Sequence, residues 1–198
     1  PGGPFEMGSP HATPDERPVH TVVLDPFCID RYEVTNAQYR QCVAAGGCQV
    51  PTTCKYGEPA YADTEKANHP VVCVIWSEAK TYCEWRGARL PTEAEWEKAA
   101  SGTNSRTYSW GKQDPTQTLL NYNGNVGDAT PVGNYPEGMS PYGAYDMVGN
   151  AWEWAADWYD KDYYAKSPTV NPTGPSFGDF VVLRSGAFND DSTHVRAA

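Results

Sequence analysis

The segment from Gly143 to Tyr159 limits more than any other how this chain can fold. It contains three Trp and two Tyr, interleaved with the carboxylates of Asp146, Glu153 and Asp157. Large aromatic side chains normally lie in a core or an interface, and carboxylates buried among them need donors, protons or a metal ion. The pair Gly149-Asn150 interrupts any regular helix or strand. The sequence therefore predicts a packed turn whose acidic oxygens either bind a hard cation such as calcium or accept hydrogen bonds from backbone and arginine.

The composition indicates one globular domain with many loops. The 198 residues include 18 Gly and 17 Pro, yet 39% of the residues are hydrophobic and 13% are aromatic, which argues against disorder. No linker or repeat divides the chain, so we expect a single domain over residues 1–198. The net charge of −10 disfavours nucleic acid and anionic membranes as partners. No stretch reaches the roughly 18 apolar residues of a membrane-spanning helix.

The cysteines all lie in the first half of the chain, at Cys28, Cys42, Cys48, Cys54, Cys73 and Cys83. Their even number and clustering predict that most or all form disulfides, in an extracytoplasmic compartment: secreted, periplasmic or cell-surface. The connectivity is not readable, although Cys42 and Cys48 flank the end of an expected helix and suit a local pair. Cys73 and Cys83 have apolar neighbours and are alternatively buried free thiols. Zinc is a weaker third option, because no Cys-x-x-Cys occurs.

Capping boxes formed by Thr35 with Gln38 and by Thr92 with Glu95 predict the starts of two helices. Ser77 is the expected N-cap of a third helix. The expected helices run from residue 35 to a stop at 46–47, over 78–86 and over 93–100, and the expected strands lie at 21–24, 27–29, 69–76, near 132 and at 180–184.

Glu93, Glu95 and Glu97 crowd one helix start and invite a catalytic interpretation. Acidic residues are favoured in a first helical turn by the helix dipole, and Glu95 already serves the capping box. Successive odd positions do not share one helix face, so these carboxylates are not a prearranged acid–base pair. We interpret them as structural, with Arg89 pairing with one of them or with a backbone carbonyl.

Four stretches follow one another in a recognisable order: Phe5–Ser9, Ile29–Asn36, Arg89–Glu97 and Gly149–Trp154. They resemble, in sequence and in order, the motifs of the formylglycine-generating-enzyme (sulfatase-modifying factor) family, and the resemblance covers essentially the whole chain. It implies an α+β, C-type-lectin-like fold that is loop-rich with little regular secondary structure, and an opening strand at residues 5–9.

The resemblance also implies two calcium sites. The first would use the side chains of Asp146 and Glu153 with the carbonyls of Gly149 and Ala151. The second would use Asn121, the carbonyl of Tyr122 and Asp128, in a loop that is shorter than in the family's enzymes. A bound divalent ion would stabilise a half of the chain that has little regular structure.

The chain departs from the family where the family's chemistry is expected. Active members oxidise a sulfatase cysteine with a copper-binding cysteine pair that follows the strand corresponding to residues 181–188. Aligned on that strand, Asp190 and Val195 stand at the two positions, and neither supplies the thiolate that copper(I) needs. No cysteine follows Cys83, so copper is not expected and catalysis is disfavoured.

Family domains usually continue past a segment like His194–Ala198 and finish on a further strand. The resemblance therefore implies that this domain lacks its final C-terminal strand segment, either as a fragment or because another polypeptide supplies it. A missing strand would leave an open sheet edge.

The surface that replaces the cysteine pair offers polar groups beside aromatic rings. The candidate ligand-binding residues are Trp152, Trp154, Phe188, Asp190, Asp191, His194 and Arg196, with Asp190 and His194 as possible metal ligands and Asp191 with Arg196 as a polar patch. Rigid aromatics beside adaptable polar groups suit a saccharide, peptide or protein ligand. The alternative is a solvated polar loop over residues 189–196.

Three functions follow from these observations. The favoured one is a non-catalytic extracytoplasmic binding or structural module, stabilised by calcium. The second is a metal-dependent oxidase of the same family with an altered active site that uses His194 and carboxylates. The third is a subunit of a larger surface assembly whose partner supplies the missing strand. The fold alone does not choose among them.

Overall fold

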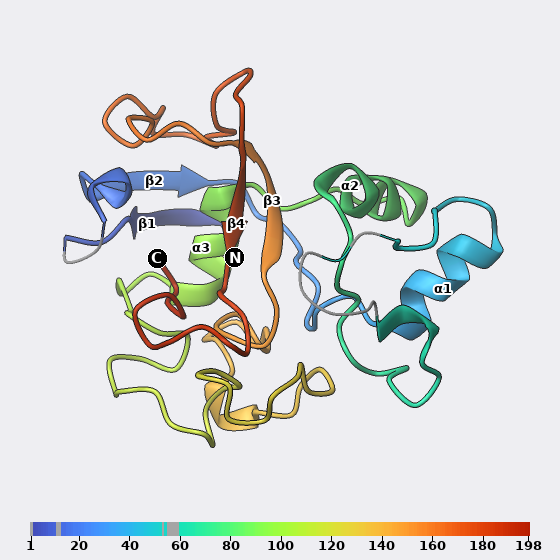
Figure 1. The fold of residues 1–198 in the computed structure, drawn as a ribbon. Coiled ribbons are helices and arrows are strands. Elements are labelled where there is room, and N and C mark those ends of the chain that lie inside the picture. The colour runs from blue at the N-terminus through green and yellow to red at the C-terminus, as the bar shows by residue number, and fades with distance from the viewer. Residues whose placement is uncertain (1, 11–12, 53, 55–59) are drawn as a thin grey trace.

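Two small antiparallel sheets and three helices carry the fold (Figure 1). The structure, a computed structural model, describes residues 2–10, 13–52, 54 and 60–198. The strands are β1 (Gly3–Met7) paired with β2 (His20–Leu24), and β3 (Glu153–Trp158) paired with β4 (Val181–Arg184). The helices are α1 (Asn36–Ala44), α2 (Trp76–Trp85) and α3 (Glu93–Ser101), with short 3-10 turns at Pro14–Glu16, Ala60–Ala62 and Pro136–Gly138.

The arrangement confirms the predicted α+β class with little regular structure. α3 contacts all four strands, whereas α1 and α2 pack on each other to one side of the sheets (Figure 1). The connection between α3 and β3, over residues 102–152, is almost entirely loop and turn. Within the described part of the chain, no helix has the length and apolar character needed to cross a membrane.

Local capping chemistry predicted the starts of α1 and α3 correctly. Thr35 and Gln38 form a reciprocal capping box at α1, and Thr92 and Glu95 form another at α3. Gly102 ends α3 with a positive φ of 73°, a conformation that glycine adopts without strain. The third helix begins earlier than predicted, because the cap is not Ser77.

At α2 the helix already includes Trp76, and Ile75 is its N-cap. The backbone N–H of Ile75 donates to the carboxylate of Glu78 over 2.9 Å. Ser77 therefore lies inside the first turn, and the predicted Ser77 cap is wrong.

Several predicted strands are also wrong. Residues 69–76 do not form a buried strand: Pro70 makes one isolated bridge, and Cys73 has a φ of 65° that turns the chain. Most of the run is half-buried, Ile75 is exposed, and Pro70 has no N–H to donate to a ladder. The stretches at 27–29 and near 132 belong to neither sheet. The predicted opening strand is present as β1, and the strand predicted at 180–184 is present as β4.

The main core is built around Trp96 of α3, which is fully buried. Apolar side chains of the long loop pack against it, among them Leu120, Met147 and Val148, together with Val195 near the end of the chain. Two smaller clusters lie under the first sheet and between α1 and α2. The loop-rich half is thus held by side-chain burial and hydrogen bonds.

The glutamates at the start of α3 have the structural role that was predicted. Arg89 donates two hydrogen bonds of 2.7 Å to the Glu95 carboxylate, which also accepts from the Thr92 backbone. Arg184 of β4 donates to Glu97 over 2.8 Å and to Glu93 over 3.3 Å. These pairs join α3 to the second sheet and to its own N-terminal loop.

Four of the six cysteines form disulfides, Cys42–Cys48 and Cys54–Cys73. The local Cys42–Cys48 pair is confirmed, whereas Cys73 is bonded and not a free thiol. Cys28 is free and exposed, and Cys83 is free and half-buried. The prediction that most or all six are oxidised therefore holds for four, because Cys28 and Cys83 have no disulfide partner within the chain.

Arg184→Met should lower the free energy of unfolding by about 3–5 kcal/mol, because it leaves Glu97 buried without its cationic partner. Urea denaturation measures the change. Lys80→Met is the matched control: it removes an exposed ion pair with Glu84 on α2 and should cost no more than about 0.5 kcal/mol. Equal effects of the two substitutions would contradict the role given to Arg184.

Candidate calcium site and the cavity beside it

The turn at Gly149–Glu153 is shaped by backbone that only certain residues tolerate. Gly149 and Asn150 have φ angles of 83° and 64°, in the left-handed region. A Cβ on Gly149 would lie 2.5 Å from the carbonyl oxygen of Asn121, so no larger residue fits. Ser185, the residue after β4, donates its hydroxyl to the Gly149 carbonyl over 2.9 Å. Contacts within the protein therefore hold the turn from both sides.

The turn brings Asp146 and Glu153 together with a carboxylate that was not predicted, that of Glu33. Asp146 accepts a hydrogen bond from the Gly133 backbone over 2.6 Å, and Glu153 accepts one from the Trp96 indole over 2.9 Å. Glu33 accepts from the Asn150 side chain over 2.8 Å through one oxygen. Its other oxygen, Oε1, is buried and has no hydrogen-bond partner.

Burial raises the pKa of all three carboxyl groups, and the negative charges of Asp146 and Glu153 act on Glu33. Burial raises the pKa of Asp146 to about 6 and the pKa of Glu153 to about 7. Burial, with the negative charges of Asp146 and Glu153, raises the pKa of Glu33 well above its usual range. Within the described residues, no Arg, Lys or His pairs with any of the three. Only protons or a bound cation would compensate their charge.

Calcium prefers several oxygen ligands in flexible geometry. Among the described residues, no group of three or more His, Cys, Asp or Glu side chains is arranged closely enough to hold a metal ion. Asp146, Glu153 and the carbonyls of Gly149 and Ala151 lie on one turn, and Glu33 adds an oxygen that nothing else satisfies. The sequence signal for Glu33 was present, because it lies in the Ile29–Asn36 motif. Spacing gave no reason to connect that motif to a turn more than 100 residues later.

The second predicted calcium set is only partly assembled. The Asn121 side chain donates to the Asp128 backbone carbonyl over 2.8 Å, and its own Oδ1 is buried without a partner. The Asp128 carboxylate accepts from Lys66 over 2.6 Å and from the Ala129 backbone, and these partners lower its pKa. The Asp128 side chain is therefore directed to a lysine, and the Tyr122 carbonyl, which was the predicted ligand, accepts from the Asn125 N–H over 3.1 Å.

The predicted ligand-binding residues fall into two separate groups. Trp152 and Trp154 line a cavity of about 520 Å³, and the other five residues do not line it. Those five lie in the last part of the chain, and each makes hydrogen bonds within the protein. Asp190 accepts from the Ala187 backbone, and Asp191 is bonded to Thr193 and His194. Arg196 donates to Glu16, and the Phe188 backbone N–H donates to Asn150.

At the two positions aligned with the family's cysteine pair, the side chains have structural contacts. Val195 is fully buried in the main core. Asp190 accepts the Ala187 N–H over 2.8 Å and so closes the turn after β4. Arg196 donates to Glu16 over 2.9 and 2.7 Å and not to Asp191, so the predicted Asp191–Arg196 patch does not form a pair.

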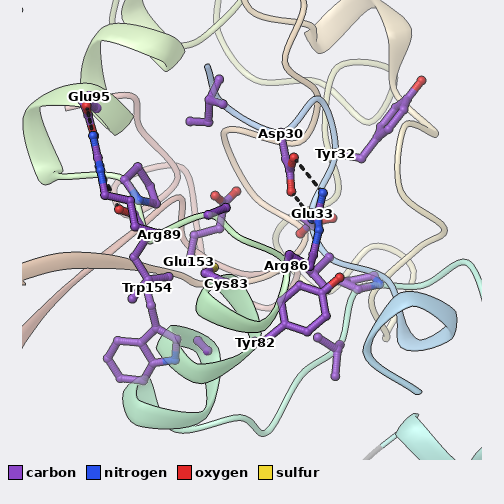
Figure 2. A pocket seen from close by; sticks show the side chains of 18 of the residues that line it. Asp30, Tyr32, Glu33, Tyr82, Cys83, Arg86, Arg89, Glu95, Glu153 and Trp154 are labelled. Carbon is purple, nitrogen blue, oxygen red and sulfur yellow. Dashed lines mark hydrogen bonds and ion pairs between the residues drawn. The ribbon is translucent and has the colours of Figure 1, made fainter. Parts of the chain in front are cut away.

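The cavity lies directly beside the carboxylate turn (Figure 2). Tyr82 and Cys83 of α2, with its C-cap Arg86, line one wall, and Asp30 accepts from Arg86 over 2.6 Å. Glu33 and Glu153 line the same cavity (Figure 2). A cavity of this size is within the range of ligand pockets, about 300–1,000 Å³. Its walls come from segments far apart in the sequence, which is why the sequence did not reveal it.

Fold and site together define a loop-rich α+β domain built around an acidic, glycine-containing turn. The sulfatase-modifying factor enzyme 1-like domain matches residues 1–198 of this chain. The chain belongs to that family, and the resemblance found in its motifs is confirmed.

Relatives in the family carry different names. A formylglycine-generating enzyme from Streptomyces coelicolor is 36% identical over 246 residues, covering 95% of this chain and 77% of that protein. A hercynine oxygenase from Mycolicibacterium smegmatis is 34% identical, covering 95% of this chain and 53% of that protein. The serine/threonine-protein kinase pkn1 of Chlamydia pneumoniae is 38% identical, and the match covers all of this chain but only 33% of that protein.

Solved structures show the same fold. PvdO from Pseudomonas aeruginosa superposes with a TM-score of 0.80 at 26% identity, covering 100% of this chain and 84% of that chain. Treponema denticola variable protein 1 superposes with a TM-score of 0.76 at 22% identity, covering 99% and 86%. The second likeness bears on the fold alone.

In chelator, Glu153→Gln should flatten the dependence of stability on pH. Folding raises the Glu153 pKa from 4.5 to about 7, so the folded state holds this proton more tightly than the unfolded state does. Stability present below pH 4.5 is therefore lost as the pH rises through about 7, by at most about 3 kcal/mol. Urea denaturation at pH 5 and 7.5 measures the loss. The exposed-site variant Glu84→Gln should keep the wild-type dependence, and a Glu153→Gln variant that also keeps it would contradict the assignment.

Proposed function

We propose that this domain is a non-catalytic extracytoplasmic binding module whose acidic turn is stabilised by calcium. The observation that carries the proposal is that Glu33, Asp146 and Glu153 have pKa values raised by burial and form no ion pair within the described part of the chain. At neutral pH such a cluster destabilises the fold unless a cation is bound. A divalent ion would compensate the charge and satisfy the orphaned Glu33 oxygen together.

Calcium suits the position of this cluster in the fold. The turn joins the long loop of residues 102–152 to β3, and that loop has few regular hydrogen bonds of its own. An ion held by Asp146 and Glu153 at the end of the loop, and by Glu33 from the segment before α1, would tie together parts that are distant in the chain. The energy of binding the ion would then add directly to the stability of the fold.

The non-catalytic role is supported by the side chains at the two positions aligned with the family's copper-binding cysteines. Val195 contributes to the core and Asp190 closes a turn, so neither offers a soft ligand or a redox-active group. The two free thiols, Cys28 and Cys83, both line the cavity of about 520 Å³, and Cys83 lies on α2 whereas Cys28 lies outside the helices and strands. Extracytoplasmic placement is supported by the two disulfides, which persist where the surroundings are oxidising.

The competing function is that of a metal-dependent oxidase. It is favoured by the names of two relatives, a formylglycine-generating enzyme and a hercynine oxygenase. His194 is exposed and hydrogen-bonded to Asp191 over 3.2 Å, which would give an oxidase one imidazole and one carboxylate at the surface. The binding module remains our proposal, since its carboxylate cluster is far more buried than this pair.

Chelation should lower the melting temperature of the wild-type chain. With calcium at about 100 times its dissociation constant, the ion would add about 2.7 kcal/mol, or roughly 5–10 °C for a domain of this size. Glu33→Gln and Glu153→Gln should each remove the difference between calcium and chelator, measured by thermal unfolding followed by circular dichroism. Asp162→Asn, in an exposed loop, should retain it. An unchanged wild-type melting curve after chelation would rule out a structural ion.

The chain should not convert cysteine to formylglycine. Incubation with copper and a cysteine-containing sulfatase peptide should yield no aldehyde by mass spectrometry and no oxygen uptake above a blank, because the aligned positions hold Asp190 and Val195. A formylglycine-generating enzyme serves as the positive control. Aldehyde formation that disappears in a Cys83→Ser variant would show that the active site lies in the cavity and would refute the non-catalytic role.

A further inference from the structure

The second calcium set implied by the family resemblance does not fit a calcium ion in this chain. It consists of Asn121, the carbonyl of Tyr122 and Asp128, so it offers a single carboxylate. Both oxygens of that carboxylate are engaged, because the Lys66 ammonium donates to one over 2.6 Å and the Ala129 backbone N–H donates to the other over 2.8 Å. Calcium takes about six to eight oxygen ligands. The cation at this carboxylate is therefore one that the chain itself supplies.

Lys66 is held beside Asp128 by the backbone around it. The Lys66 carbonyl accepts from the Asn36 side chain, at the start of α1, over 2.9 Å. Two residues later, the Asn68 carbonyl accepts the Val132 N–H over 3.0 Å, which fixes this segment against the loop that carries Asp128. Exposed ion pairs usually contribute little, because two mobile side chains must be brought together. Here the two backbones are already side by side, so the lysine loses less freedom when it reaches the carboxylate.

The charges around Asp128 disfavour a second cation. The hydrogen bond to Asp128 raises the pKa of Lys66, so the ammonium keeps its charge well above neutral pH. His69, from the same segment, also lies close enough for its charge to act on Asp128. A divalent ion brought to this carboxylate would meet the positive charge of Lys66 at short range, where like charges repel strongly.

One buried oxygen beside the ion pair keeps the character of a metal ligand. Asn121 is 1% exposed, and its Oδ1 has no hydrogen-bond partner among the described residues. The Asn121 Nδ2 donates to the Asp128 carbonyl over 2.8 Å, so the amide is held next to Asp128. Without the Lys66 charge, a free carboxylate and an unsatisfied buried oxygen would lie together, and both are ligands that a hard cation prefers.

We propose that the Lys66 ammonium takes the place of the second calcium ion, so that a lysine of the chain, and not a metal, joins residues 60–69 to the loop over residues 121–132. This connection does not depend on the calcium concentration of the surroundings. The inference goes beyond the proposed function, because it concerns a different set of residues and holds whether or not the acidic turn binds calcium.

Calcium titration of substituted chains tests the inference. All chains carry Glu153→Gln, which removes the site proposed at the acidic turn, so that calorimetry reports on the Asp128 loop alone. Calcium is raised to about 5 mM, above the dissociation constants of weak extracellular sites, about 0.1–1 mM. The Glu153→Gln chain should bind no calcium. Adding Lys66→Met, which keeps the apolar stem and removes the charge, should create one calcium site per chain, and further addition of Asp128→Asn should abolish it.

Lys80→Met is the matched control, because Lys80 forms an exposed ion pair with Glu84 on α2. In the Glu153→Gln background it should create no calcium site. The same calcium concentration should raise the melting temperature of the Lys66→Met chain by roughly 3 °C and leave that of the Lys80→Met chain unchanged.

A measurement on the wild-type chain covers the case in which Lys66→Met does not fold. The Nζ resonance of Lys66, followed by nitrogen-15 NMR, should stay in place as calcium is raised to about 5 mM, since the ammonium is not displaced from Asp128. Movement of that resonance with calcium would overturn the inference, as would calcium binding that depends on Asp128 while Lys66 is present. A folded Lys66→Met chain that binds no calcium would also overturn it, because the lysine would then replace nothing. None of these results depends on calcium at the acidic turn, whose own test is the chelation of the wild-type chain.

Discussion

The pairing of Arg184 with Glu93 and Glu97 is the interaction on which the rest of the structure depends. It joins the last residue of β4 to the buried face of α3, with the guanidinium above the Trp96 ring at 5.1 Å. Glu97 also accepts the Gly8 backbone N–H over 2.6 Å, so the first sheet is joined to the same helix. Because Ser185 follows Arg184 and donates to the carbonyls of Gly149 and Asp146, the acidic turn is positioned through this pair as well.

The protein buries its carboxylates in two different ways. Around α3 the acids have arginine partners: Glu95 has Arg89, and Glu97 has Arg184. Around the turn, Glu33, Asp146 and Glu153 accept from neutral donors, and none of them forms an ion pair with another described residue. Burial raises the pKa of Glu97 to about 7 even beside Arg184, which shows how costly a buried negative charge is here. A cluster with no cationic side chain is therefore the place in this fold where an external cation would contribute most.

Much of the fold was predictable, because the helix starts are encoded locally. A capping box needs only residues three apart, and both predicted boxes are present at Thr35 and Thr92. The apolar run at 69–76 was misjudged because its residues are mostly half-buried in a segment that turns at Cys73 and makes one isolated bridge. The N-cap at Ile75 was missed because the capping contact there is the Ile75 backbone N–H donating to the Glu78 side chain. The residue type at the N-cap position gives no sign of such a contact.

The site was predictable only where its residues share one turn. Asp146 and Glu153 stand out through their spacing in an aromatic segment, whereas Glu33 reaches the turn from 117 positions earlier through the Asn150 side chain. Nothing in the sequence indicated the cavity, because its walls come from residues 26–34, α2 and the start of β3. Such contacts depend on how the elements pack and not on any local signal, which is why the aromatic residues Trp152 and Trp154 were assigned to the wrong neighbours.

The acidic turn and the cavity share a wall, so a change of charge at the turn acts on the cavity. Glu33 and Glu153 line the cavity whose other surfaces are largely apolar. Ionised and without a cation, they would make the inner end of the cavity a poor place for an apolar side chain, because that side chain would exclude the water that solvates them. An ion coordinated by the same carboxylates would remove that cost. Under the proposed function, calcium would then strengthen the binding of any apolar group in the cavity by neutralising the cavity's inner end, and by reciprocity that group would strengthen the binding of calcium.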